Sequence, residues 1–441
     1  MQLSDHFTIG RLIRFTVPSI AMMVFTSIYG VVDGLFVSNF AGKMAFTALN
    51  FIMPVVMMLS AAGFLFGTGG VALISKYMGE GRQDKADELF TQNVITSFLC
   101  GIVLAVLGVI LMPKVSAWLG AEGELLEKSS LYGRILMISL PFYIMQTEFQ
   151  TIFPAAEKPK LGLYVTVTAG VCNMILDALF CGVFGWGLVG AAAATVICEY
   201  IGGLLPLIYF ISPKNTSRLR FRRFTYDFKA LFKVLTNGSS ELMSNISMSL
   251  VGMLFNVQLL KYAGNDGVAA YGVIMYVNFI FIAMFIGYSV GAAPLMSYNF
   301  GAGNKLEMRG ILNKSLRIIG CGAIAMFAIA NLLGGTIASI FVGYDEELLN
   351  VTKHAFRIYA FSFLLSGFSI YASSFFTALN DGLTSALISF MRTLIFEVIC
   401  LLALPVIFGV DGIWFSVLAA EFMSVVFASV FMITKRKKYG Y

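Results

Sequence analysis

Seven acidic residues lie inside long apolar stretches of the sequence, where a charged side chain is costly. They are Asp33, Glu148, Asp177, Glu199, Glu241, Glu397 and Glu421. A carboxylate at the centre of a bilayer costs about 2.5 to 3.5 kcal/mol even on insertion scales. We therefore expect each of these side chains to face the interior of the protein with a partner or a bound proton, and we take them as the candidates for function.

Three pairs of polar residues are four positions apart, which places both members of a pair on one helix face: Tyr29–Asp33, Asn173–Asp177 and Thr195–Glu199. Carboxylate, amide and hydroxyl oxygens suit a hard cation or a proton. The sequence thus predicts a Na⁺ or H⁺ site formed by Asp33, Asn173, Asp177 and Thr195. A zinc site is not expected, because only His6 and His354 are available and the six cysteines show no CxxC spacing.

Structural roles compete with this interpretation, because an isolated acid can also tie two helices together by hydrogen bonds. For Glu199 and Glu421 the two roles are weighed equally. Glu397 lies five residues after Arg392, and we expect a local ion pair between them. Glu148 and Glu241 are left unassigned.

The elements that position these residues are apolar runs long enough to cross a bilayer, which takes about 20 residues. The 441-residue chain is 58% apolar or aromatic and 12% charged, which excludes a soluble enzyme and a disordered chain. Twelve runs are predicted as spans: 14–38, 46–76, 93–113, 131–153, 161–184, 188–211, 232–262, 268–299, 315–341, 354–377, 384–408 and 412–433.

Most of the 30 Lys and Arg residues fall on alternate loops, above all in the segment 214–233. Positive loops stay in the cytoplasm, so both termini are predicted to be cytoplasmic. RNA or lipid binding is the rival interpretation of the basic 214–233 segment, but topology alone explains it.

The two halves of the sequence resemble each other when the chain is shifted by 222 residues. GGVALISKYMGEG then aligns with AAPLMSYNFGAG, and a second block pairs Gly187 with Gly409 and Glu199 with Glu421. We expect an N-terminal six-helix lobe (1–212), a basic cytoplasmic linker (213–231) and a C-terminal six-helix lobe (232–441), in parallel orientation. Because Asn173 and Asp177 align with isoleucines, the coupling ion should bind in the N-terminal lobe.

The motifs VDGLFVSNFAG, NMILDALFCGVFGWGLVGAAAATVI and GIWFSVLAAE resemble those of the multidrug and toxic compound extrusion (MATE) family. This resemblance implies an all-α membrane protein with twelve transmembrane helices in two six-helix lobes, and export of organic cations against a Na⁺ or H⁺ gradient. By similarity Asp33, Asn173, Asp177 and Thr195 match the family's N-lobe cation site. The expected substrate contacts are Tyr29, Asp33, Asp177, Glu199 and Glu241.

The sequence departs from the family pattern at FPAAEKPK, which contains Glu157, and at LTNGSSELMSN, which lacks a proline but keeps Glu241. A transporter in the plasma membrane that needs no cofactor, oligomer or nucleic acid is expected, with the bilayer and a small organic substrate as its partners. It should not be an enzyme, because no nucleotide-binding loop or nucleophile and base motif is present. The alternatives are a flippase for a lipid-linked precursor and a channel or scaffold; a flippase would favour several deep cations, and only Arg392 lies deep in a predicted span.

Overall fold

The computed structural model describes residues 1–343 and 345–441, without the side chains of Leu35, Ser38, Lys43, Asn265 and Phe341. The described chain is helical throughout and contains no β-strand. The N-terminal bundle comprises α1 (Ile9–Phe36), η1 (Val37–Ala41), α2 (Lys43–Ser60), α3 (Ala62–Gly79), α4 (Gln83–Trp118), α5 (Gly123–Ala155), α6 (Pro159–Asp177), η2 (Ala178–Val183) and α7 (Gly187–Ile211). The C-terminal bundle comprises α8 (Phe228–Gly301), α9 (Lys305–Val342), α10 (Glu346–Ala360), α11 (Phe363–Ala378), α12 (Gly382–Phe390), η3 (Met391–Phe396), α13 (Glu397–Phe408), α14 (Val410–Thr434) and α15 (Arg436–Tyr439).

Each of the twelve predicted runs falls within these helices, and the all-α membrane fold is confirmed. Among the described residues, ten helical stretches are long and apolar enough to cross a membrane, and there are eleven if α10 and α11, which are bent by 48°, form one span. The remaining run, 131–153, lies in α5, which carries the buried polar residues Gln146, Thr147, Glu148, Gln150 and Thr151. Because these side chains are buried, this part of α5 is shielded from lipid.

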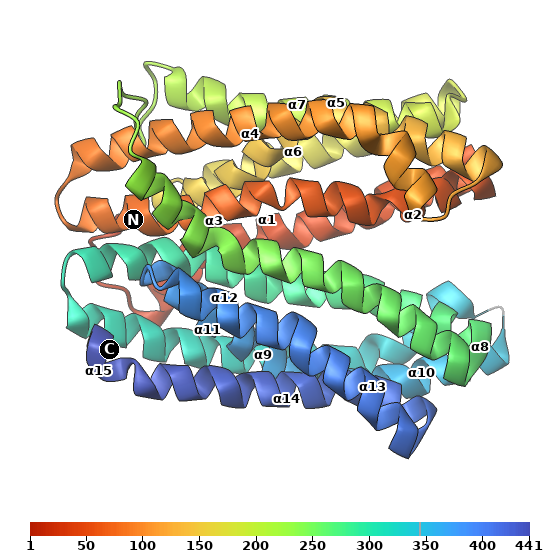
Figure 1. Cartoon of the computed structure of the whole chain (residues 1–441). Helices are drawn as coiled ribbons and strands as arrows, with labels where there is room; N and C mark the ends of the chain where they lie inside the picture. Colours follow the sequence, from red (N-terminus) through yellow and green to blue (C-terminus); the bar gives the residue numbers. More distant parts are fainter. Residues whose placement is uncertain (344) are drawn as a thin grey trace.

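Both chain termini lie at one end of the molecule, which we call the terminal end; the opposite end is the distal end (Figure 1). The two bundles lie on either side of a dividing plane, with α3 and α8 beside it. The long helix α8 is broken at Gly264, whose φ of 63° is open mainly to glycine. Gly264 is the counterpart of Gly42, with φ of 87°, at the 222-residue offset, so the same turn recurs in both bundles.

The two bundles come into close contact where α3 and α8 reach the terminal end. A Cβ atom on Gly79 would lie 2.0 Å from the carbonyl oxygen of Tyr298, and one on Gly301 would lie 2.1 Å from that of Lys76. The 222-residue offset turns the first contact into the second. This reciprocity is what a pseudo-two-fold axis between the bundles produces.

The N-terminal segment fastens the same end. The backbone N–H of Leu3 donates to Glu157 of the N-terminal bundle (2.8 Å), and that of Phe7 donates to Glu307 of the C-terminal bundle (2.9 Å). His6 Nδ1 lies 2.6 Å from Glu307 Oε2, and Lys314 donates to the Phe7 carbonyl. Leu3 and Phe7 are fully buried, so residues 2–8 form a strap across the closed terminal end.

Candidate functional site

α1 and α6 place Asp33 and Asp177 near one another. The two helices pack closely because Gly170 of α6 receives the rings of Phe25 and Tyr29. Asp33 lies in the last turn of α1 before η1, and Asp177 is the last residue of α6 before η2. Single π-helical turns are frequent at functional sites, because they widen the helix and reorient its side chains.

The carboxyl groups of Asp33 and Asp177 lie close enough to interact electrostatically. Asp177 is fully buried, and neither of its oxygens receives a hydrogen bond from another described group; Asp33 Oδ1 is likewise unpartnered. Two facing carboxylates repel strongly in a buried environment, so the pair needs a proton or a bound cation to be stable. This arrangement can bind and release one positive charge.

Asn173 and Thr195 contribute differently. Asn173 lies one helical turn before Asp177 and is 2% exposed. Its Nδ2 atom has no hydrogen-bond partner among the described residues. The Thr195 hydroxyl donates to the carbonyl of Ala191 in its own helix (3.1 Å), which leaves its oxygen lone pairs free. No described contact joins Thr195 to either aspartate. Its role as a ligand stays a prediction.

Glu199 and Tyr29 lie beside this pair. Glu199 Oε2 accepts a hydrogen bond from Ser139 of α5 (2.5 Å), and Tyr29 interacts electrostatically with Glu199 and Asp33. Within the described part of the chain no three Asp, Glu, His or Cys side chains gather in the manner of a metal centre. A cation here would therefore be held by two carboxylates and neutral oxygens.

Helix α5 also borders the site, which the sequence analysis did not predict. Tyr132, which is 1% exposed, interacts electrostatically with Asp33, Asp177 and Glu199, and Tyr143 interacts with Glu199. Tyr132, Ser139 and Tyr143 are spaced by seven and four residues, which puts them on one helix face. That spacing was the available signal.

The expected ion pair between Arg392 and Glu397 is wrong. Arg392, in η3, donates to both carboxylate oxygens of Glu421 on α14, at 2.6 to 3.1 Å, and Ser369 adds a hydrogen bond at 3.4 Å. A bidentate arginine–carboxylate pair across two helices has better geometry than a pair five residues apart on one helix. Glu421 is therefore structural in this conformation.

Glu241 and Glu148 lie away from the aspartate pair. Glu241 is in the C-terminal bundle, where its electrostatic partner is Arg392. Glu148 is fully buried and accepts hydrogen bonds from Asn93 (2.7 Å) and Ser97. Asn93 also donates to the Phe66 carbonyl (3.0 Å), so this cluster ties α3, α4 and α5 together.

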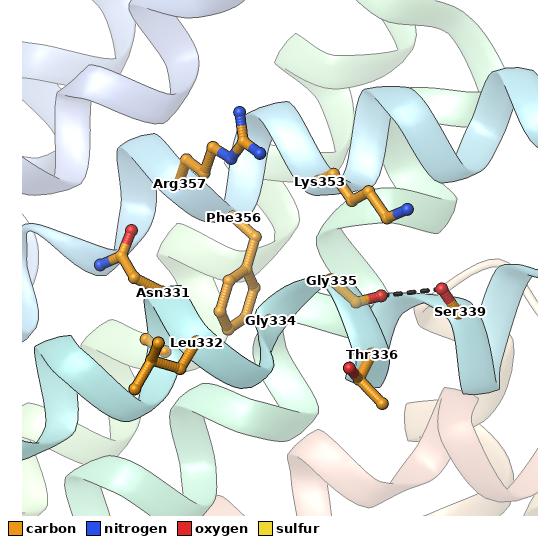
Figure 2. A pocket seen from close by; sticks show the side chains of 10 residues that line it. Asn331, Leu332, Gly334, Gly335, Thr336, Ser339, Lys353, Phe356 and Arg357 are labelled. Atoms are coloured by element: carbon orange, nitrogen blue, oxygen red, sulfur yellow. Dashed lines mark hydrogen bonds between the residues drawn. The ribbon is translucent and has the colours of Figure 1, made fainter.

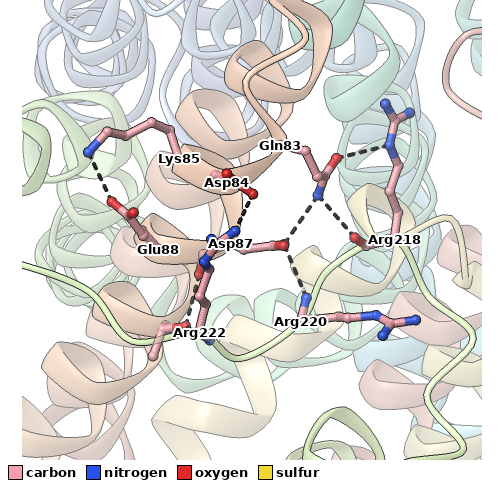
Figure 3. Close-up of polar contacts among 9 residues, drawn as sticks. Gln83, Asp84, Lys85, Asp87, Glu88, Arg218, Arg220 and Arg222 are labelled. Carbon is pink, nitrogen blue, oxygen red and sulfur yellow. Dashed lines mark hydrogen bonds and ion pairs between the residues drawn. The ribbon is translucent and has the colours of Figure 1, made fainter.

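The basic segment 214–233 folds against the start of α4 (Figure 3). Arg222 pairs with Asp84, the backbone N–H of Arg220 donates to Asp87 (3.1 Å), and Arg218 donates to Gln83 (3.2 Å). Part of the positive charge is thus used within the chain. This fits a topological role for the segment better than RNA binding.

A family model, MatE, matches residues 18–179 and 242–402. The chain is 24% identical over 415 residues to the multidrug export protein MepA of Staphylococcus saprophyticus, covering 93% of this chain and 90% of the relative. It is 25% identical over 413 residues to MepA of Staphylococcus haemolyticus, with the same coverage.

Solved structures share the fold. A multidrug resistance MATE family transporter in an outward-facing conformation superposes with a TM-score of 0.93 at 20% identity, over 99% of this chain and 97% of that one. A transporter of the same superfamily from Pyrococcus furiosus, whose binding pocket is described as reversed in polarity, gives 0.90 at 21% identity, with the same coverage. Such similar folds with different pockets leave the substrate to be argued from the site. The family match over both halves shows that the chain belongs to the MATE family of membrane transporters and is not an enzyme.

Proposed function

We propose that the protein exports amphiphilic organic cations from the cell, coupled to inward movement of Na⁺ or H⁺ through the Asp33–Asp177 pair. The observation that carries this proposal is the pair itself: the fully buried carboxyl group of Asp177 lies near the half-buried one of Asp33, and neither oxygen of Asp177 has a described hydrogen-bond partner. A group of this kind changes its stability greatly when one positive charge arrives or leaves. The naming of the MepA relatives as multidrug export proteins supports the choice of substrate class.

In the proposed cycle the conformation described here, whose bundles are fastened together at the terminal end, is the one that receives the coupling ion from the outside. Hydrogen bonds between the bundles are found from the strap as far as Ser27, which donates to the Phe279 carbonyl at 3.4 Å. The coupling ion enters from outside, neutralises the aspartates and lets α1 and α6 rearrange, which releases the substrate. The bundles then separate at the terminal end, which we place in the cytoplasm of a cell whose plasma membrane holds the protein.

The electrical driving force is sufficient for such export. One positive charge moving inward down 100 mV yields about 2.3 kcal/mol, which supports roughly fifty-fold accumulation of a neutral solute outside. Electroneutral exchange with a monovalent cation would forgo this electrical contribution and depend on the ion's concentration gradient alone.

The flippase alternative loses support at Arg392. A lipid phosphate would need unpaired cations deep in the cleft, and the guanidinium of Arg392 is already held by Glu421. We therefore propose the antiporter alone, acting without a need for oligomerisation or a further cofactor.

The test is efflux of a fluorescent organic cation from proteoliposomes under an imposed Na⁺ gradient, an imposed pH gradient, or neither. The wild type is expected to respond to one gradient, and Asp177→Asn is expected to lose that response. Asp266→Asn, at an exposed position near the broken point of α8, is the matched control and should behave as the wild type. Equal transport by wild type and Asp177→Asn would refute the proposal.

A further inference from the structure

A pocket of about 450 Å³ opens between α9 and α10 near the distal end, away from the aspartate pair (Figure 2). Its floor forms where Phe356 of α10 reaches Gly334 of α9, whose Cβ would lie 2.5 Å from the ring. Its rim carries Thr336 and two cations one helical turn apart, Lys353 and Arg357.

Neither cation has a partner within the described chain. No carboxylate oxygen lies within 4.0 Å of Lys353 or Arg357, and neither donates a described hydrogen bond. Among the other cations toward the distal end, Lys128 pairs with Glu124 at 2.7 Å, Arg134 donates to the Val109 carbonyl and His354 pairs with Asp411 at 2.8 Å, whereas Lys114 has no described partner. The pocket is thus lined by two positive groups that have no partner in the described chain.

On α9 the pocket is lined by the polar Asn331, Thr336 and Ser339 as well as by Leu332, and exposed apolar side chains lie beside these residues along the helix. Leu332 is 79% exposed, Leu333 50% and Ile340 76%. In a membrane-spanning protein such exposed apolar side chains meet acyl chains. Positive groups beside lipid-facing apolar side chains at the end of a membrane span can bind a lipid phosphate. Arginine binds phosphate with a planar set of hydrogen-bond donors.

We propose that this pocket binds the phosphate of an anionic phospholipid in the leaflet at the distal end, with Lys353 and Arg357 holding the phosphate and the acyl chains lying along Leu332 and Leu333. The head group neutralises the two cations. The site is separate from the transport pathway, so it concerns the lipid environment of the C-terminal bundle and not the exported substrate.

The experiment measures lipid binding to the purified full-length protein in detergent by native mass spectrometry. The probes are phosphatidylglycerol, zwitterionic phosphatidylcholine and inorganic phosphate. The variant is Lys353→Gln with Arg357→Gln. The matched control is Lys114→Gln with Lys261→Gln, which removes two cations from elsewhere toward the distal end; Lys261 lies over the Tyr262 ring.

The wild type and the control are expected to bind phosphatidylglycerol at least about tenfold more tightly than the pocket variant. Phosphatidylcholine should bind weakly to all three, and millimolar phosphate should not displace phosphatidylglycerol. The proposal is overturned if the pocket variant binds phosphatidylglycerol as well as the wild type does, or if the control loses binding equally. Displacement of phosphatidylglycerol by inorganic phosphate would show that the pocket binds a soluble anion and not a lipid phosphate. Because no transport is measured, failure here leaves the antiporter proposal untouched.

Discussion

At the scale of single residues, the coupling role proposed for Asp33 and Asp177 has a cost in stability. A fully buried carboxyl group beside a half-buried one is costly to fold, and three of the four oxygens have no hydrogen-bond partner among the described residues. Glu148 shows the opposite arrangement, since Asn93 and Ser97 satisfy its carboxylate. The contrast separates an acid that must change its charge state from one that holds helices together.

Asp33→Asn is therefore expected to stabilise the protein while it abolishes coupling. Removing one of two repelling buried charges should raise the free energy of unfolding by about 1 kcal/mol, and the unfolding temperature in detergent measures this. Asp266→Asn, exposed at the break in α8, should change nothing. Clear destabilisation by Asp33→Asn would mean that this carboxylate has a structural role.

Asp381, between α11 and α12, provides a pH-dependent anchor for the C-terminus. Burial raises the pKa of its carboxyl, but hydrogen bonds from Lys435 (2.7 Å), Tyr439 (2.8 Å) and Thr384 outweigh burial and lower the pKa below its usual value. A lowered folded-state pKa adds stability above the unfolded pKa of about 3.9, and this stability is lost as the pH falls through the folded value.

The difference in unfolding temperature between wild type and Asp381→Asn should consequently be constant from about pH 5 to 7 and shrink below about pH 4. After solvent screening it should correspond to about 1 kcal/mol or less. A thermal melt series at several pH values checks this. A difference that grows in acid would contradict the sign.

At the scale of elements, α3 and α8 form the tightest contact between the bundles. Gly79→Ala would place a methyl group 2.0 Å from the Tyr298 carbonyl, so the helices must move apart. We expect a shift toward conformations open at the terminal end, with a stability loss of about 1 to 3 kcal/mol. Spin-label distances across the terminal end measure the shift. Gly10→Ala, with open space around it, is the control, and an unchanged distance distribution in Gly79→Ala would rule out the tight contact.

The strap of residues 2–8 should act on the same equilibrium. Glu307→Gln removes the negative charge that contacts His6 and accepts a hydrogen bond from the Phe7 backbone N–H. The Phe7 carbonyl in turn accepts a hydrogen bond from Lys314. The rate at which a thiol reagent labels a cysteine at the terminal end should increase several-fold in Glu307→Gln. Glu347→Gln, in the first turn of α10, should leave this rate unchanged. Equal labelling rates in wild type and Glu307→Gln would show that the strap does not hold the bundles together.

The positions of the helices could largely be predicted from the sequence, whereas the contacts between distant helices could not. Apolar length located all twelve runs, and the repeat offset paired Gly187 with Gly409, which both have a positive φ in the structure. Periodicity on a single helix could not reveal that Arg392 crosses to Glu421, that Tyr132 and Ser139 border the aspartates, or that residues 2–8 bridge two bundles. Those contacts depend on how distant helices pack, which local spacing does not encode.

At the scale of the whole molecule, the contacts between the two bundles are related by the pseudo-two-fold axis, whereas the aspartate pair is not. The reciprocal Gly79–Tyr298 and Gly301–Lys76 contacts treat the bundles alike. The aspartate pair exists only in the N-terminal bundle, because its counterparts at the 222-residue offset are apolar. One bundle can thus receive the ion while both move about a common axis.

The most direct test of this coupling is to measure the ion itself. Proteoliposomes loaded with an organic cation would be followed for uptake of ²²Na⁺ or protons as the substrate leaves, in wild type and in Asp177→Asn. We expect substrate-dependent ion uptake by the wild type and none by the variant, with substrate binding retained. Ion uptake by Asp177→Asn at the wild-type rate would contradict the assignment of Asp33 and Asp177 as the coupling site.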